Sequence, residues 1–110
     1  MLFRYRAKVA KVVDGDTIDV DIDLGFYTIL RNQRIRLKGI DAPEPRGKER
    51  FAGLASKAWL KDEIEGKEIE IVTFKNAKGK YGRWLGVVYM NRQNINQLMI
   101  EKELAVPSLQ

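Results

Sequence analysis

The feature that most constrains the fold of this 110-residue chain is the alternation of apolar and polar residues in its first forty positions. The alternation is clearest over residues 17–24, where every second residue is apolar: Thr17, Ile18, Asp19, Val20, Asp21, Ile22, Asp23 and Leu24. A period of two is typical of a strand with one buried face. We therefore predict a strand here whose inward row includes Leu24, preceded by an opening strand that starts at Tyr5 or Ala7.

The alternation continues beyond this strand. Gly25 is the expected turn, and residues 27–39 are predicted to form the next strand, with Ile35 and Leu37 pointing inward. Three consecutive strands joined by short turns are typical of an antiparallel sheet.

A helical period follows. One set of residues has the i, i+3, i+4, i+7, i+8 spacing of an amphipathic helix: Phe51, Leu54, Ala55, Ala58 and Trp59. This spacing predicts that these side chains form the buried stripe of the helix, and Gly66 is placed to end it.

Strand patterns return in the last third of the chain. Residues 68–71 alternate, and residues 84–89 form a strand that is apolar on both sides. A basic loop that contains glycines, residues 76–82, connects them, and Ile95, Leu98 and Met99 indicate a short final helix.

The order of elements is three strands, a helix, two strands and a helix. We therefore expect a mainly β protein with helices (α+β), in which residues 1–110 form one domain. A five-stranded OB-fold-type barrel with two to three helices is the most economical closure of such strands, and this fold commonly binds nucleic acids. The alternative is an open antiparallel sheet with two helices on one face.

Composition excludes several kinds of chemistry. The chain has no cysteine and no histidine, which excludes thiol and imidazole catalysis, disulfides and the common zinc sites. Its net charge of +5 and isoelectric point near 9.6 favour an acidic partner such as nucleic acid.

Location and assembly are expectations only. No apolar run approaches the roughly 20 residues that span a bilayer, and no apolar leader follows the first residues. We expect a cytoplasmic protein without a membrane partner, or a secreted one if a signal peptide was removed, and a monomer.

Charge is unevenly distributed along the chain. Residues 1–13 hold four basic and no acidic residues, whereas residues 14–24 hold five aspartates and no base. Basic blocks return over residues 31–38 and 75–83. Such an acidic segment between basic ones fits a metal site that faces a polyanion, although strands of opposite charge also pair well in an ordinary sheet.

Two aspartates are candidate metal ligands. Asp16 falls on the inward row of its strand, where a carboxylate needs a cation or hydrogen bonds, whereas Asp19 and the two outward aspartates after it are expected to form a solvated face. Asp41 follows the third strand and shares the row of Leu37. Two carboxylates from separate strand ends would suit Ca²⁺ or Mg²⁺, with water and backbone carbonyls completing the shell.

Further polar residues accompany this pair. Pro43 and Pro45 restrict the backbone on either side of Glu44, and Arg36 and Arg83 could bind phosphate oxygens with two parallel hydrogen bonds. Either arginine could instead pack its stem on the sheet. The alternation of rows does not place Arg36 beside Asp41.

Three segments together resemble the motifs of the thermonuclease family, that is, staphylococcal nuclease and its relatives. They are Val13-Asp14-Gly15-Asp16-Thr17, then Arg36-Leu37-Lys38-Gly39-Ile40-Asp41-Ala42-Pro43-Glu44, then Lys80-Tyr81-Gly82-Arg83. The similarity covers residues 7–106 in matching order. It implies an SNase-like domain that acts as a calcium-dependent phosphodiesterase on DNA and RNA, cutting the 5′ P–O bond to leave 3′-phosphates, with single-stranded or frayed regions favoured.

The resemblance also implies a role for each site residue. Asp16, Asp41 and the backbone carbonyl of Ala42 would bind Ca²⁺, or Mg²⁺ in its place, with Asp14 beside the metal. Glu44 would position or deprotonate the attacking water. Arg36 and Arg83 would stabilise the phosphate in the transition state, and Lys80 and Tyr81 would contact the terminal phosphate of the nucleotide. The alternative function is a catalytically weak or inactive OB-fold domain that binds nucleic acid.

Overall fold

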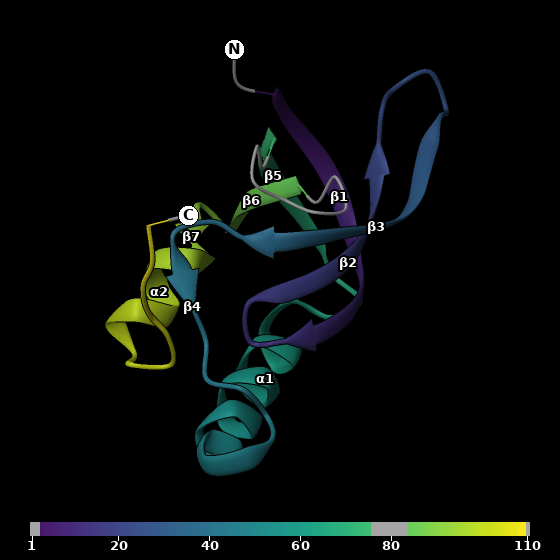
Figure 1. The fold of residues 1–110 in the computed structure, drawn as a ribbon. Helices are drawn as coiled ribbons and strands as arrows, with labels where there is room; N and C mark the ends of the chain where they lie inside the picture. The colour runs from purple at the N-terminus through teal and green to yellow at the C-terminus, as the bar shows by residue number, and fades with distance from the viewer. Residues whose placement is uncertain (1–2, 76–83, 110) are drawn as a thin grey trace.

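Five long strands build the body of the molecule (Figure 1). The computed structural model describes residues 3–75 and 84–109. The long strands are β1 (Phe3–Asp14), β2 (Thr17–Asp23), β3 (Ile29–Leu37), β5 (Glu68–Lys75) and β6 (Trp84–Met90). The shorter elements are β4 (Ile40–Asp41), a 3₁₀ turn η1 (Gly47–Glu49), α1 (Arg50–Ile64), β7 (Gln93–Asn94), α2 (Ile95–Glu101) and β8 (Val106–Pro107).

The strands close into a barrel. They pair in the order β3, β2, β1, β5, β6, and a parallel pairing of β3 with β6 joins the two edges. Gly86 of β6 is closely packed at this closure: a Cβ atom there would lie 2.7 Å from Ile35 Cγ2 and 2.8 Å from Ile71 Cδ1, so these side chains would have to shift. The predicted five-stranded OB-fold-type barrel is confirmed, and the open sheet is wrong.

The inward row of β2 is largely as predicted. Ile18, Val20 and Ile22 are buried in the barrel core, as are Ile35 and Leu37 of β3.

The strand ends differ from prediction. Leu24 is 45% exposed, because the chain leaves the sheet and turns over residues 25–28. Positive φ angles at Phe26 and Tyr27 belong to this turn, so β3 spans Ile29–Leu37 rather than 27–39. The opening strand starts at Phe3, earlier than expected, because its first residues pair with β5.

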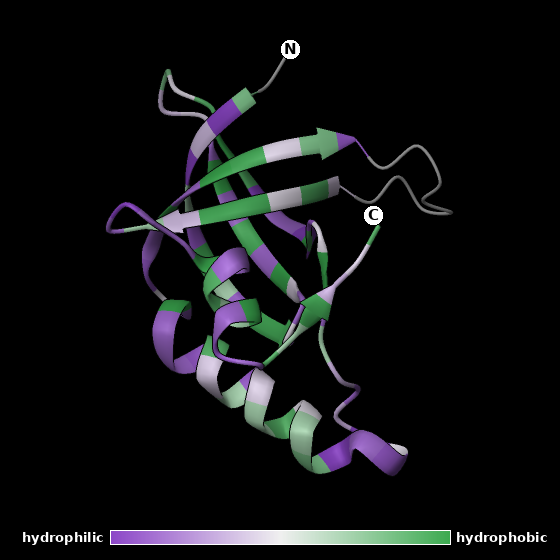
Figure 2. Cartoon of the chain, turned by 90° about the vertical axis from the view of Figure 1, so that its left-hand side faces the viewer, coloured by the Kyte–Doolittle hydropathy of each residue, from purple (hydrophilic) through white to green (hydrophobic). Residues whose placement is uncertain are grey.

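Helix α1 has a different buried face from the one predicted. Its buried residues are Gly53, Ser56, Leu60 and Ile64, while Phe51 is 86% exposed. The helix lies beneath the barrel (Figure 2). Its C-terminal turns carry the large buried side chains. Its N-terminal half instead packs its inward side against the backbone of Glu44, where no side chain fits. The small residues at 53 and 56 therefore set the phase of the helix.

Two of the three outward aspartates of β2 form ion pairs with β3. Arg34 Nε donates to Asp19 Oδ1 at 2.9 Å, and Arg31 Nη1 donates to Asp21 Oδ2 at 3.2 Å. The hydrogen bond to Asp19, followed by its Coulomb attraction, raises the pKa of Arg34. Asp19 and Asp21 are thus engaged in cross-strand pairs and are not simply solvated, whereas Asp23 is exposed and accepts from the Gly25 amide at 2.8 Å.

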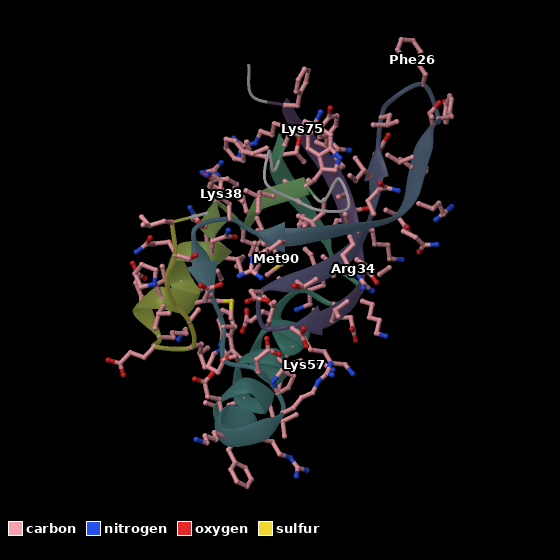
Figure 3. All side chains as sticks on the ribbon, viewed as in Figure 1. Phe26, Arg34, Lys38, Lys57, Lys75 and Met90 are labelled. Atoms are coloured by element: carbon pink, nitrogen blue, oxygen red, sulfur yellow. The ribbon has the colours of Figure 1, made fainter. Side chains whose placement is uncertain are left out.

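The β2–β3 hairpin carries an apolar tip. Phe26 and Tyr27 are fully exposed there, and Phe26 points away from the barrel (Figure 3). Within residues 3–75 and 84–109, neither helix has the length and apolar character required to cross a bilayer.

Candidate active site

Asp16 is held at the end of the barrel, in the turn between β1 and β2. Its side chain is only 12% exposed, and such a carboxylate is costly to bury without partners. Asp16 Oδ2 accepts a hydrogen bond from the Ala42 amide at 3.0 Å, and Oδ1 accepts one from Thr17 Oγ1 at 3.1 Å. The main chain is fixed as well, because the Leu37 amide donates to the Asp16 carbonyl at 2.8 Å. The position and direction of this carboxylate are therefore well defined.

Arg36 joins two of the predicted site residues. It pairs with Thr17 across β2 and β3, so its guanidinium lies beside Asp16, with Nη2 at 3.6 Å from Asp16 Oδ2. The same nitrogen donates a hydrogen bond to Asp41 Oδ1. The alternation of inward and outward residues along β3 could not predict this contact. The positive φ of Gly39 turns the chain between β3 and β4, so the alternation of β3 does not continue into β4.

Asp41 occupies the end of the short strand β4. It pairs with Val106 of β8, and the Ser108 amide donates to the Gly39 carbonyl at 2.9 Å, which ties this segment to the C-terminal part of the chain. The Asp41 side chain is about half exposed, at 48%. A cavity of about 260 Å³ adjoins it, lined by residues 41–43, Glu49 and residues 103–106. Asp41 is therefore reachable from solvent.

Glu44 and Asp14 lie next to this cluster in the chain. Glu44 is exposed, on the segment between β4 and η1. Asp14 ends β1 opposite Thr17, and its charge is the smallest of the causes that raise the pKa of Arg34. Among residues 3–75 and 84–109, the ion pairs of Arg36 are with Asp16 and Asp41 and not with Asp14. The structure thus brings Asp16, Arg36 and Asp41 together, whereas Asp14 and Glu44 are neighbours of this cluster in the chain.

Three other predicted residues, Lys80, Tyr81 and Arg83, lie outside the described residues. Their roles in contacting phosphate remain predictions from the sequence.

The donor set fits a hard cation. In the described ranges, no group of three or more His, Cys, Asp or Glu side chains is placed to hold one ion. Asp16 and Asp41 both pair with the same guanidinium nitrogen of Arg36, however, which shows that the two carboxylates can interact with one positive charge. Two carboxylate oxygens with a backbone carbonyl and water suit Ca²⁺ or Mg²⁺ better than a softer metal.

Comparison with known proteins identifies the family. The model of the family described as "Staphylococcal nuclease homologue" matches residues 34–109, which is more than half of the chain. The protein belongs to the staphylococcal nuclease homologue family. The matched range includes Arg36, Asp41 and Glu44, whereas Asp16 lies before it.

Several known proteins match over most of the chain. A micrococcal nuclease of Shigella flexneri is 34% identical over 92% of this chain and 57% of its own length. An uncharacterized endonuclease of Escherichia coli O157:H7 is 37% identical over 84% of the chain and 54% of its own length. A thermonuclease of Staphylococcus hyicus is 30% identical over 89% of the chain and 56% of its own length. The chain thus spans little more than half the length of these relatives.

Sequence reasoning missed two supports of this nuclease-family site. Asn96 of α2 is buried, and its Nδ2 donates to the Lys38 carbonyl at 2.9 Å and to the Gly86 carbonyl at 3.0 Å, while its Oδ1 accepts from the Val88 amide at 3.1 Å. An asparagine near a helix start looks like a capping residue, so no sequence signal marked it. The other support is Gly53, whose position inside a helix was the available signal, because glycine is a poor helix former.

Proposed function

We propose that this domain is a calcium-dependent nuclease that hydrolyses phosphodiester bonds of DNA and RNA, with Mg²⁺ as the alternative ion. The observation that carries the proposal is the convergence of Asp16 and Asp41, from separate strand ends, on Arg36. The names of the relatives, micrococcal nuclease, thermonuclease and endonuclease, support the same reaction class. The net charge of +5 suits a polyanionic substrate.

In this proposal, Asp16, Asp41 and the carbonyl of Ala42 hold the ion, with Asp14 beside it. When bound, a hard divalent ion neutralises phosphate charge and makes coordinated water more acidic. The Ala42 amide donates to Asp16 Oδ2, which fixes the main chain at Ala42 next to this carboxylate. The three oxygen donors thus come from two segments that are hydrogen-bonded to each other.

Arg36 acts on the phosphate. Its guanidinium lies beside both carboxylates, so a phosphate bridging to an ion held there would come within its reach. Guanidinium groups bind phosphate oxygens with two parallel hydrogen bonds and stay charged at every working pH. Arg83 is assigned the same task from the other side, near the leaving oxygen, and Lys80 and Tyr81 contact the terminal phosphate.

Glu44 acts on water. Its exposed carboxylate, on the segment after Asp41, positions or deprotonates the water that attacks phosphorus. The bond from phosphorus to the 5′ oxygen then breaks, which leaves a 3′-phosphate and a 5′-hydroxyl. Single-stranded or frayed regions are the favoured substrates, because a lone strand can bring its phosphate to the recessed Asp16 more easily than a duplex can.

Cleavage assays test the proposal. Plasmid, single-stranded DNA and RNA are incubated with the parent protein and with Asp16→Asn and Asp41→Asn, in Ca²⁺, Mg²⁺ or chelator, and the product ends are treated with phosphatase. We expect cleavage by the parent in Ca²⁺, loss in chelator and in both variants, and phosphate at the 3′ ends. Cleavage that persists in chelator would rule out the metal. Binding of the oligonucleotides without cleavage under any condition would instead identify a noncatalytic nucleic-acid-binding domain.

A further inference from the structure

Gly53 of α1 touches the backbone that carries Glu44. A Cβ atom built on Gly53 would lie 2.2 Å from the Glu44 carbonyl oxygen, 2.3 Å from the Glu44 carbonyl carbon and 2.5 Å from the Pro45 nitrogen. Real Cβ atoms do not approach heavy atoms this closely, and all three neighbours are backbone atoms that cannot rotate away. Only glycine at position 53 permits this approach of the Glu44 segment to the helix.

The same helix face also supports the turn that holds Asp16. A Cβ atom on Gly15 would lie 2.9 Å from Ser56 Cβ and 2.8 Å from Ala42 Cβ. Ser56 is on the buried face of α1 with Gly53, one helical turn away. One rigid helix therefore supports both the Asp16 turn and the Glu44 segment, and the distance between these two parts of the site depends on how closely each approaches α1.

The side chain of Glu44 depends on this support. Within residues 3–75 and 84–109, its carboxylate has no hydrogen-bond or ion-pair partner that would fix it from another direction. Its position is set by its own backbone, which two prolines restrict and which packs on Gly53. A shift of this backbone would therefore move the carboxylate by a similar amount.

We propose that Gly53 is a positioning residue that places Glu44 relative to the pair Asp16 and Asp41. The inference rests on the proposed function of Glu44 in activating water. It assigns the helix a part in catalysis: the missing side chain at position 53 lets the Glu44 segment lie deep enough for its carboxylate to reach the attacking water. A displacement of about 1 Å can reduce the rate of an enzyme by about 100-fold.

The test compares Gly53→Ala with the parent and with Ala58→Gly. Ala58 is an exposed residue of the same helix, so this control changes helix propensity without touching the Glu44 segment. We expect Gly53→Ala to lower kcat by about 10- to 100-fold, with the KM for oligonucleotide and the calorimetric Kd for Ca²⁺ changed less than about 3-fold. Ala58→Gly should keep the kcat of the parent. An equal loss of kcat in both variants would overturn the proposal.

A double-mutant cycle separates positioning from general damage. In a Glu44→Gln background, Gly53→Ala should lower kcat by less than about 2-fold further, because its effect acts through the carboxylate that is already gone. If Gly53→Ala reduces kcat by the same factor in both backgrounds, the positioning role is wrong. If Glu44→Gln alone keeps the parent kcat, the proposed role of Glu44 fails, which is a distinguishable result.

A second variant covers the case in which Gly53→Ala does not fold. Pro45→Gly frees the backbone next to Glu44 without adding a heavy atom to the helix contact. In the protein that keeps Glu44, Pro45→Gly should lower kcat and leave the Kd for Ca²⁺ unchanged. In the Glu44→Gln variant, it should have little effect on kcat. Unaltered kcat in Pro45→Gly would show that the placement of this segment does not limit the reaction, and would overturn the proposal.

Discussion

The main-chain amide of Ala42 donates a hydrogen bond to Asp16 Oδ2 at 3.0 Å. This bond joins the turn between β1 and β2 to the end of β4, two segments that are 26 residues apart. It leaves Asp16 Oδ1 to Thr17 and brings the carboxylate within 3.6 Å of Arg36. A carboxylate in this position has a structural task, holding β4, in addition to its proposed binding of a cation.

The two tasks of Asp16 can be separated by substitution. Asp16→Asn keeps an oxygen that can accept from the Ala42 amide but loses the charge, so we expect a free energy of unfolding within about 1 kcal/mol of the parent. Calorimetry should show clearly weaker binding of Ca²⁺, because the affinity of such a site depends on the number of charged ligands. Asp16→Ala leaves the amide without its acceptor and should lose a further 1–3 kcal/mol or so in urea denaturation. If Asp16→Asn binds Ca²⁺ as tightly as the parent does, Asp16 is not a ligand of the ion.

Removal of Arg36 should make the protein depend more on Ca²⁺. In Arg36→Met, Asp16 and Asp41 lose the cation between them, and their repulsion should lower the free energy of unfolding in chelator by roughly 1–3 kcal/mol. Added Ca²⁺ should restore more stability in this variant than in the parent, because binding to the folded state alone stabilises it. Urea denaturation at increasing Ca²⁺ concentrations measures both effects.

Arg34→Met is the matched control for this experiment. Arg34 is also an arginine of β3, but it pairs with Asp19 on the exposed outer face. Exposed pairs of this kind contribute about 1 kcal/mol or less. The control should therefore lose little stability and respond to Ca²⁺ as the parent does. Equal behaviour of the two variants would argue that Arg36 does not act as the counter-ion of the site.

The sequence was sufficient for the barrel and for part of the site. Alternation identified the rows of β2 and β3, so Asp16 could be placed inward before its partners were known. The contact of Arg36 with Asp41 could not be predicted in this way, because it depends on the turn at Gly39 rather than on strand parity. Periodicity describes residues within one element, whereas a site assembled from several elements depends on the turns between them.

Asn96 should be among the most sensitive polar positions in the fold. Its side chain makes three hydrogen bonds to the main chain and so connects α2 to β6 and to the end of β3, next to the candidate site. Asn96→Ala leaves one amide and two carbonyls to find other partners and should lower the free energy of unfolding by about 3 kcal/mol. Asn96→Asp should cost at least as much, since a carboxylate cannot donate to the carbonyls of Lys38 and Gly86.

Asn94 provides the control for Asn96. Asn94 caps the same helix by accepting from the Gln97 amide at 3.0 Å, and loss of such a cap costs about 1 kcal/mol. Asn94→Ala should therefore be clearly milder in urea denaturation. A loss of stability as small in Asn96→Ala as in Asn94→Ala would mean that the buried hydrogen bonds contribute little.

The phase of α1 was the main error of sequence reasoning, and its cause is physical. A hydrophobic stripe predicts a buried face only when the neighbouring surface has room for large side chains. Here the N-terminal half of the helix packs closely on the Glu44 backbone, so small residues are buried and Phe51 faces solvent. Gly53 is the one sequence signal of this close contact, and the hydrophobic periodicity of the helix does not by itself distinguish the two arrangements.

Two substitutions in α1 test the observed phase. Phe51 is 86% exposed and Leu60 is fully buried in the core, although the predicted stripe contained Phe51 and not Leu60. Phe51→Ser should change the free energy of unfolding by no more than about 0.5 kcal/mol, as is usual at the surface. Leu60→Ala should lower it by about 2–5 kcal/mol, because it leaves a cavity beneath the barrel. Both values follow from urea denaturation at equal protein concentration. A loss of more than about 2 kcal/mol of unfolding free energy in Phe51→Ser, with a smaller loss in Leu60→Ala, would contradict this packing of α1. It would indicate that the stripe with Phe51 is the buried face of the helix.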